Sequence, residues 1–189
     1  MTETASSGLS RRNLLRIFAA TAVVAAPVSA NAFGIMRGAG DIRQVRMYNP
    51  RTGESLNTIY WIEGEYIREA LQEINYFMRD WRTNGVISMD ARNMDIMAAA
   101  HRLLGTREPY TLLSGHRSKK TNDMLRSRSS GVARDSLHIV GKAADLQLRS
   151  RTVSQMANAA AACASGGVGR YSGSNFVHMD CGPIRHWGA

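Results

Sequence analysis

The chain has 189 residues, of which 44% are hydrophobic, and this length suffices for one domain with a real core but not for two ordinary domains. Its formal net charge is +9. A positive chain can attract nucleic acid, anionic lipid or an acidic polymer, but no block of five or six consecutive basic residues occurs, as a dedicated nucleic-acid tail would require. We therefore expect a single domain with no nucleic-acid partner.

The amino-terminal segment has the pattern of a bacterial export signal. Residues 10–16 contain the twin-arginine sequence Ser-Arg-Arg-Asn-Leu-Leu-Arg, residues 17–27 are apolar, and 30–32 read Ala-Asn-Ala, a small-residue cleavage site. A retained membrane anchor is the alternative, but the uninterrupted apolar run is shorter than the roughly 20 residues of a spanning helix. We predict a twin-arginine (Tat) signal peptide over 1–32 and a mature domain over 33–189.

Export determines what the mature protein can meet. Removal of residues 1–32 takes away three arginines and one glutamate, which lowers the formal charge from +9 to about +7. We expect the Tat machinery to export the folded protein to the periplasm, with no stable membrane insertion after cleavage. There the acidic polymer is the carboxylate-rich peptide mesh of the cell wall, rather than nucleic acid.

Both cysteines, Cys163 and Cys181, belong to the predicted mature part. A disulfide between them is one alternative, because the compartment is oxidising. However, Cys163 lies in an alanine-rich helical segment and Cys181 in a strand pattern. We therefore favour two small, buried thiols.

Hydrophobic periodicity predicts the elements of the mature chain in order. They are strands at 44–48 and 55–62, helices at 65–82 and 90–104, a strand at 110–114, a polar helix at 119–128, a flexible stretch at 129–133, a strand at 143–148, a helix at 153–164, a glycine turn at 166–169 and a last strand at 175–181. Trp81 is placed on the core face of the first helix. The pattern predicts a single compact α+β domain whose helices pack against a small antiparallel sheet.

Two short motifs carry the chemistry. Residues 136–145 read Ser-Leu-His-Ile-Val-Gly-Lys-Ala-Ala-Asp, and residues 178–180 read His-Met-Asp. Two imidazoles and a carboxylate, from His138, His178 and Asp145, form a ligand set that holds one catalytic Zn²⁺ and leaves a position open for water. Such a site predicts a hydrolase that contains one zinc ion per chain.

The two motifs are expected to meet in space. Because side chains at i and i+2 of a strand share a face, His178 and Asp180 should face a cleft while the apolar residues between and beside them face the core. His138 should come from the loop before the strand that carries Asp145, and Gly141 allows the tight bend that this loop needs.

The ordered motifs resemble those of the M15 superfamily of zinc peptidases, and most closely its exported branch once described as a domain of unknown function, DUF882. Besides 136–145 and 178–180, the segments 114–118, 166–171 and 176–182 are similar to that branch's Ser-Gly-aromatic-Arg-Ser element and its last strand pair. The likeness covers essentially the whole mature chain. It implies a fold like that of hedgehog and D-Ala-D-Ala peptidases, zinc ligands at His138, Asp145 and His178, and cell-wall peptide as the substrate.

The resemblance also implies a residue for substrate recognition. Arg117 would hold a substrate carboxylate or carbonyl, for which a planar guanidinium is better suited than a lysine; an ordinary surface charge is the alternative. His116, its neighbour, is expected to line the cleft and to bind substrate. His101 lies in a helical pattern and is expected to be structural.

One position departs from the superfamily pattern. Many members have a glutamate as the general base three residues before the last zinc histidine, and here that residue is Asn175, which cannot accept a proton. Asp180 is our first candidate for the base, with orientation of His178 as the alternative. His186 is the second candidate, with terminal packing as the alternative.

We conclude from the sequence that the chain is a zinc-dependent peptidase of peptidoglycan. The leading hypothesis is a murein endopeptidase that hydrolyses peptide cross-links next to a D-centre by zinc-activated water. The alternatives are a D-alanyl carboxypeptidase of the same class and a non-catalytic domain that binds peptidoglycan or acts as a scaffold.

Overall fold

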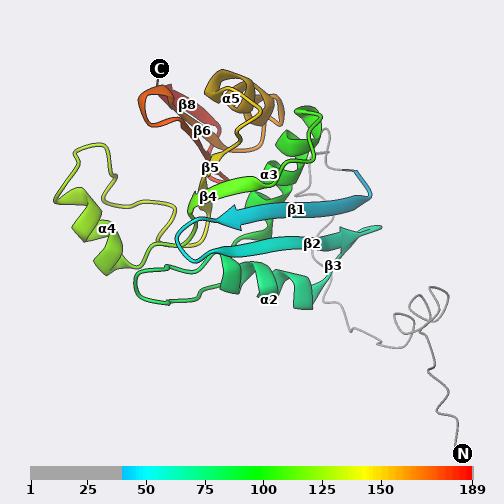
Figure 1. Ribbon diagram of the computed structural model, residues 1–189, viewed down its shortest axis with the longest axis horizontal. Coiled ribbons are helices and arrows are strands. Elements are labelled where there is room, and N and C mark those ends of the chain that lie inside the picture. Colours follow the sequence, from blue (N-terminus) through cyan, green and yellow to red (C-terminus); the bar gives the residue numbers. More distant parts are fainter. Residues whose placement is uncertain (1–39, 189) are drawn as a thin grey trace, which may run out of the picture. The chain divides into compact units, whose positions relative to one another are not determined.

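Alternating apolar residues build a hairpin at the start of the described chain. The computed structural model describes residues 40–188 (Figure 1), so the predicted signal peptide over 1–32 lies outside the described residues. β1 (Ile42–Asn49) and β2 (Glu54–Ile62) pair antiparallel, as predicted. The alternation places Val45 and Met47 in the core.

Within residues 40–188, eight strands form one sheet in the order β3-β2-β1-β4-β5-β7-β6-β8. The remaining strands are β3 (Glu65–Tyr66), β4 (Tyr110–Ser114), β5 (Ala143–Gln147), β6 (Gly167–Tyr171), β7 (Phe176–Asp180) and β8 (Arg185–Gly188). β1 pairs with β4, and β6 with β8, in parallel; the other pairs are antiparallel. The predicted α+β class is confirmed, but the sheet is larger than expected and mixed, because the hairpin joins it through β1 and a short terminal strand extends it.

The helices of the described chain are α2 (Arg68–Phe77), α3 (Ala91–Leu103), α4 (Lys119–Arg126) and α5 (Val153–Ala162). α3 and α5 pack against each other and against β7, on the face where Ala144, Leu146, Val177 and Met179 are fully buried (Figure 1). The opposite face of β5 and β7 is therefore free to carry the polar side chains at alternate positions.

Two local predictions were wrong. The first helix ends at Phe77, because Arg79 turns away to pair with Glu54, at 2.9 Å, and the Asp80 N–H bonds to the Gly85 carbonyl; Trp81 thus lies in a turn. The glycines at 166–169 were expected to form a turn, but they lead into and form β6.

Both cysteines are buried and unpaired in the described chain, as we favoured. Cys163 donates to the Ala159 carbonyl one helical turn earlier, and Cys181 lies just beyond β7. In residues 40–188 we find no helix with the length and apolar character needed to cross a membrane.

The bend at Gly141 supports a stability prediction. Its φ is +70°, and a Cβ there would lie 2.6 Å from the Ser88 carbonyl oxygen; Gly53 has φ of +73° but open space around its Cβ position. Gly141→Ala should lower the free energy of unfolding by about 3 kcal/mol, the sum of backbone strain and overpacking, and Gly53→Ala by about 1 kcal/mol. Urea denaturation measures both, and equal losses would show that the crowding at Gly141 is unimportant.

Candidate active site

His138 is held by the loop that precedes β5. This loop closes on itself through a bond from the Lys142 N–H to the Leu137 carbonyl, at 2.9 Å. The His138 ring is almost fully buried, and its Nδ1 lies 2.7 Å from the Gly115 carbonyl oxygen. Because a carbonyl only accepts, Nδ1 carries the hydrogen, and the lone pair of Nε2 points toward β5 and β7.

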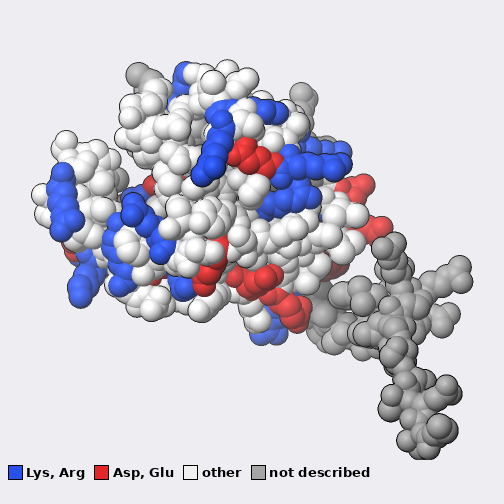
Figure 2. Space-filling model, in the orientation of Figure 1, with Lys and Arg blue, Asp and Glu red and all other residues white. Residues whose placement is uncertain are grey.

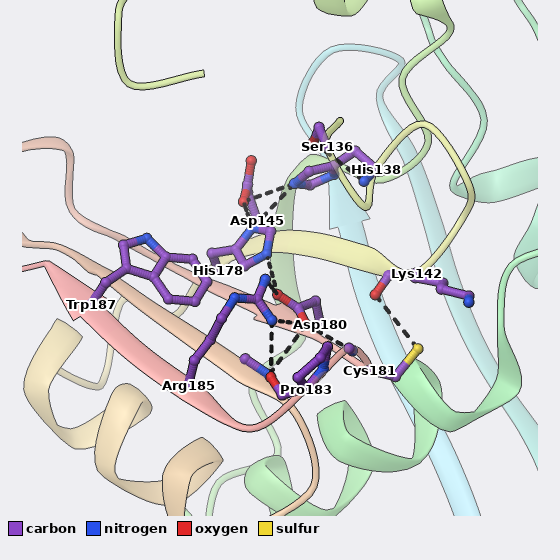
Figure 3. Close-up of polar contacts among 12 residues, drawn as sticks. Ser136, His138, Lys142, Asp145, His178, Asp180, Cys181, Pro183, Arg185 and Trp187 are labelled. Atoms are coloured by element: carbon purple, nitrogen blue, oxygen red, sulfur yellow. Dashed lines mark hydrogen bonds and ion pairs between the residues drawn. The ribbon is translucent and has the colours of Figure 1, made fainter. Parts of the chain in front are cut away.

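His178 lies on β7 with the opposite tautomer. Its Nε2 is 2.9 Å from Asp180 Oδ2 (Figure 3). Since the carboxylate accepts this hydrogen, Nδ1 of His178 has the free lone pair. The β-sheet register pairs Asp145 with His178 directly, which brings the third predicted residue beside it.

The three predicted ligand atoms converge. Asp145 Oδ1 lies 2.9 Å from His178 Nδ1 and 3.2 Å from His138 Nε2, and the two ring nitrogens are 3.2 Å apart. Ligands about 2.0–2.1 Å from a tetrahedral zinc ion lie about 3.3 Å from one another. When both rings are neutral, their single hydrogens are committed elsewhere, so three acceptors face one another and the arrangement suits a cation. The residues therefore fit zinc, and they form a cluster that could hold a metal ion.

The second oxygen of Asp145 is also engaged. Arg117 donates from one guanidinium nitrogen to Asp145 Oδ2 and from Nε to Ser114 Oγ, at 2.7 Å. Asp145 thus has only Oδ1 available to the cluster. Arg117 lines the cleft, and its contact with substrate stays a prediction; in the structure its guanidinium supports Asp145, a member of the cluster.

Burial and the neighbouring charges tune the cluster. Burial lowers the pKa of His138, so that its ring is neutral. Burial opposes ionisation of Asp145, but its contacts with His138 and His178 outweigh this and hold its pKa well below the usual range. Burial likewise opposes protonation of His178, yet its bonds to Asp145 and Asp180 raise its pKa. A metal ion must displace any proton on His178, so affinity for the ion should fall as the pH falls.

The cluster lies on the floor of a cleft of about 440 Å³. Figure 2 shows the surface hollowed between the part that contains α4 and the part that contains β6 and β8. One wall is the segment after α4, which includes Asp135 and Ser136. The other is aromatic: Tyr171 and Phe176 stack at 4.4 Å, and Trp187 Nε1 donates to the Tyr171 hydroxyl at 3.0 Å.

Asp180, the first candidate for the general base, is placed behind His178 and away from the cleft lining. It is fully buried and accepts bonds from His178, from Arg185, and from the backbone N–H groups of Gly167 and Gly182. Burial opposes its ionisation, but these bonds outweigh it and lower the pKa to about 2. A carboxylate so occupied is a poor proton acceptor, and its contact suits the orientation of His178.

The other predicted residues are not all brought to the cleft. His186 is exposed on the face of β8 toward α5, where it lies beside Ala157 and Arg170. His116 is buried behind the His138 loop, with Nδ1 3.1 Å from the His138 carbonyl oxygen. His101 bonds to the Glu108 carbonyl at 2.6 Å, in keeping with its structural role.

Asn175 lies in the turn between β6 and β7, with φ of 51°. This left-handed conformation is one that asparagine adopts several times more readily than most residues. Its side chain is exposed, while its neighbours Ser174 and Phe176 line the cleft. The asparagine thus suits the conformation of this turn, although Glu63 adopts the same left-handed region elsewhere in the chain.

Sequence reasoning missed Arg185 and gave no position to Trp187, both of which line the cleft. Their position becomes visible only in the sheet, where Gly167 and Gly169 on β6 face Arg185 and Trp187 on β8. A Cβ at Gly169 would lie 2.6 Å from the Trp187 ring, so these glycines make room for the two side chains.

Three convergent acceptors at the floor of an open cleft, two on adjacent strands and one on the loop before β5, are typical of metal-dependent hydrolases. The comparisons with known proteins narrow this class. A peptidase M15 family model, described as "Peptidoglycan L,D-endopeptidase MepK", matches residues 37–187. The chain belongs to this family of peptidases.

The chain is also similar to curated proteins of that description. It is 43% identical over 145 residues to "Peptidoglycan L,D-endopeptidase MepK" of Escherichia coli (strain K12), an alignment that covers 77% of this chain and 80% of the relative. It is 37% identical over 140 residues to "Probable peptidoglycan L,D-endopeptidase MepK" of Haemophilus influenzae, with coverage of 74% and 75%.

Asp80 anchors the segment that carries Arg117, and this supports a second prediction. Asp80 is buried and accepts from the Ser118 N–H, at 2.9 Å, and from the Arg82 N–H, at 3.0 Å. Burial opposes its ionisation, but bonds from Thr121 and Ser118 outweigh this and lower its pKa to about 2.

Asp80→Asn should lower the free energy of unfolding at pH 7 by about 2 kcal/mol. Because the folded-state pKa is depressed, this contribution is complete above the unfolded pKa of about 3.9 and is lost as the pH falls through about 2. Urea denaturation between pH 7 and pH 3 should show the difference in free energy of unfolding between the unaltered protein and Asp80→Asn becoming smaller as the pH falls. Asp123→Asn on the exposed face of α4 is the control and should leave stability nearly unchanged; a pH-independent gap for Asp80→Asn would contradict the assignment.

Proposed function

We propose that this chain is a zinc-dependent murein endopeptidase that is exported by the Tat pathway and acts in the periplasm. The observation that carries the proposal is the triangle of His138 Nε2, His178 Nδ1 and Asp145 Oδ1 at the floor of a cleft, in a member of a peptidase family. We also propose a fold of the hedgehog and D-Ala-D-Ala peptidase type, which the antiparallel arrangement of β4, β5, β7 and β6 around the site supports.

In this proposal three side chains bind the ion, and neighbouring groups orient these three ligands by hydrogen bonds. When bound, zinc supplies a Lewis acid that lowers the pKa of water toward about 7 and polarises a peptide carbonyl. His138 and Asp145 enter as a neutral ring and a carboxylate, which is the protonation state that metal ligation needs. Asp180 keeps the hydrogen of His178 on Nε2, so that Nδ1 is always the ligating atom.

Arg117 is the proposed contact for the substrate. It lies at the edge of the cluster with one guanidinium nitrogen on Asp145 and Nε on Ser114, which leaves the fork's other nitrogen for a substrate carbonyl or carboxylate. The wall formed by Tyr171, Phe176 and Trp187 would hold the apolar part of a stem peptide. The sequence has 24 Lys and Arg against 15 Asp and Glu, and Figure 2 shows Lys and Arg side chains spread over the face drawn, which favours approach to carboxylate-rich murein.

We propose that the bond cleaved joins an L-centre to a D-centre, because the relatives are named L,D-endopeptidases. In murein, a cross-link between two diaminopimelate residues has this stereochemistry, whereas a cross-link from D-alanine to diaminopimelate joins two D-centres. A carboxypeptidase of the same class would instead require a free terminal carboxylate, and a non-catalytic domain would bind sacculi without releasing products.

The ligand assignment predicts the behaviour of three single variants. His138→Ala, Asp145→Ala and His178→Ala should each abolish stoichiometric zinc binding and lower murein hydrolysis by at least about 100-fold, because a ligand is lost. Metal analysis and digestion of purified sacculi measure the two effects. His101→Gln, on the far side of the core, is the control and should retain both. Full activity in any of the three variants would contradict the site.

The choice of bond predicts a preference among defined substrates. The protein with zinc should cleave dimeric muropeptides with a diaminopimelate–diaminopimelate cross-link at least about tenfold faster than those with a D-alanine–diaminopimelate cross-link. Mass spectrometry of the products measures this preference. The release of D-alanine from monomers would identify the carboxypeptidase instead, and binding without any product would identify the non-catalytic domain.

A further inference from the structure

The terminal strand β8 places two side chains on the face that carries the cluster. Gly167 of β6 pairs with Asp180 on one side and with Arg185 on the other, and Gly169 pairs in the same way with His178 and Trp187. A Cβ at Gly167 would lie 2.5 Å from Asp180 Oδ2 and 2.6 Å from an Arg185 nitrogen. The missing side chain of Gly167 therefore lets Arg185 reach across β6 to Asp180 (Figure 3).

Arg185 binds both oxygens of Asp180. One guanidinium nitrogen lies 3.1 Å from Oδ1 and the other 2.7 Å from Oδ2. The latter oxygen is also the acceptor for His178 Nε2, at 2.9 Å. Such bidentate, charge-assisted bonds fix the plane of a carboxylate as well as its position. The orientation of Asp180, and through it the ring of His178, thus depends on Arg185.

Among the residues that the structure describes, Asp180 forms ion pairs only with Arg185 and with His178, and Arg185 is the partner that is always charged. Asp180 is fully buried, and its remaining donors are the backbone N–H groups of Gly167 and Gly182, both on Oδ1. A buried carboxylate that loses its cationic partner is costly and reorganises. Without Arg185, Oδ2 would keep only the histidine, and that bond would no longer have a fixed direction.

We propose that Arg185 is a positioning residue for the metal ligand His178: by clamping Asp180 it aims Nδ1 of His178 at the metal. This inference rests on the proposed zinc site. Direct substrate binding is the competing role, because Arg185 also lines the cleft and its side chain is 43% exposed. The geometry favours positioning, since one nitrogen of the fork bonds to both Asp180 and the Pro183 carbonyl, at 3.0 Å, and the other to Asp180.

The test uses the mature protein and measures zinc affinity directly. Arg185→Gln should weaken zinc binding by about tenfold in competition with a chromophoric chelator, the usual effect of losing a residue that orients a ligand. Arg185→Lys should lie between it and the unaltered protein, because an ammonium group restores the charge but not the fork. Arg170→Gln is the matched control: this arginine lies on the neighbouring strand, bonds to Ser154 and faces α5, so zinc affinity should not change.

A double-mutant cycle tests whether Arg185 acts through Asp180. Asp180→Asn should weaken zinc binding at least as much as Arg185→Gln, and the double variant should bind zinc no more weakly than Asp180→Asn alone. The absorption spectrum of the Co²⁺-substituted protein should change in Arg185→Gln and not in Arg170→Gln. At saturating zinc, Arg185→Gln should recover most of its kcat with little change in KM.

The outcomes separate this proposal from the one on which it rests. If the unaltered protein binds no stoichiometric zinc, the zinc site itself is wrong. If it binds zinc and Arg185→Gln has unchanged zinc affinity but a raised KM, Arg185 is a substrate contact and the positioning role is overturned. Additive losses in the double variant would overturn it too. Circular dichroism checks that each variant folds. If Arg185→Gln does not fold, the zinc affinity of Arg185→Lys is compared with that of the unaltered protein instead.

Discussion

The site depends on where two imidazole hydrogens go. His138 gives its hydrogen to the Gly115 carbonyl, and His178 gives its hydrogen to Asp180. Each ring is thereby oriented with a lone pair inward, toward Oδ1 of Asp145. Three acceptors held about 3 Å apart repel one another unless a metal ion, or a proton on His178, lies among them. The fold must therefore place the two outward acceptors, the Gly115 carbonyl and Asp180, as accurately as it places the three ligand atoms.

Contacts in the surrounding structure hold these two outward acceptors in place. Gly115 packs so closely under Met78 that a Cβ would lie 2.5 Å from the Met78 carbonyl oxygen, which fixes the carbonyl that His138 uses. On the other side, Arg185 fixes the carboxylate that His178 uses. Along this line the His178 ring separates two ion pairs, Arg117 with Asp145 on one side and Arg185 with Asp180 on the other. A guanidinium partner for each carboxylate helps both to stay ionised although they are buried beside the site.

The sequence predicted the parts of the site that depend on local pattern. The alternation around His178 placed it and Asp180 on one strand face, and the bend at Gly141 delivered His138. What could not be predicted depends on contacts between distant segments. The β6–β8 pairing is parallel and long-range, so neither the four-residue β8 nor the reach of Arg185 across Gly167 leaves a periodic signal. For the same reason His186 was considered for the base, although strand alternation turns it away from the cleft once β8 is known.

The asparagine at position 175 follows from the same packing. β6 and β7 are joined by the short turn at Ser172–Ser174, and the chain re-enters β7 through a left-handed residue. A glutamate there would have to adopt a backbone conformation that costs non-glycine residues about 1 kcal/mol or more, and asparagine tolerates it best. Asn175 thus suits the left-handed entry into β7, a region that Glu63 also adopts in this chain, and its exposed side chain leaves the three inward-facing acceptors intact.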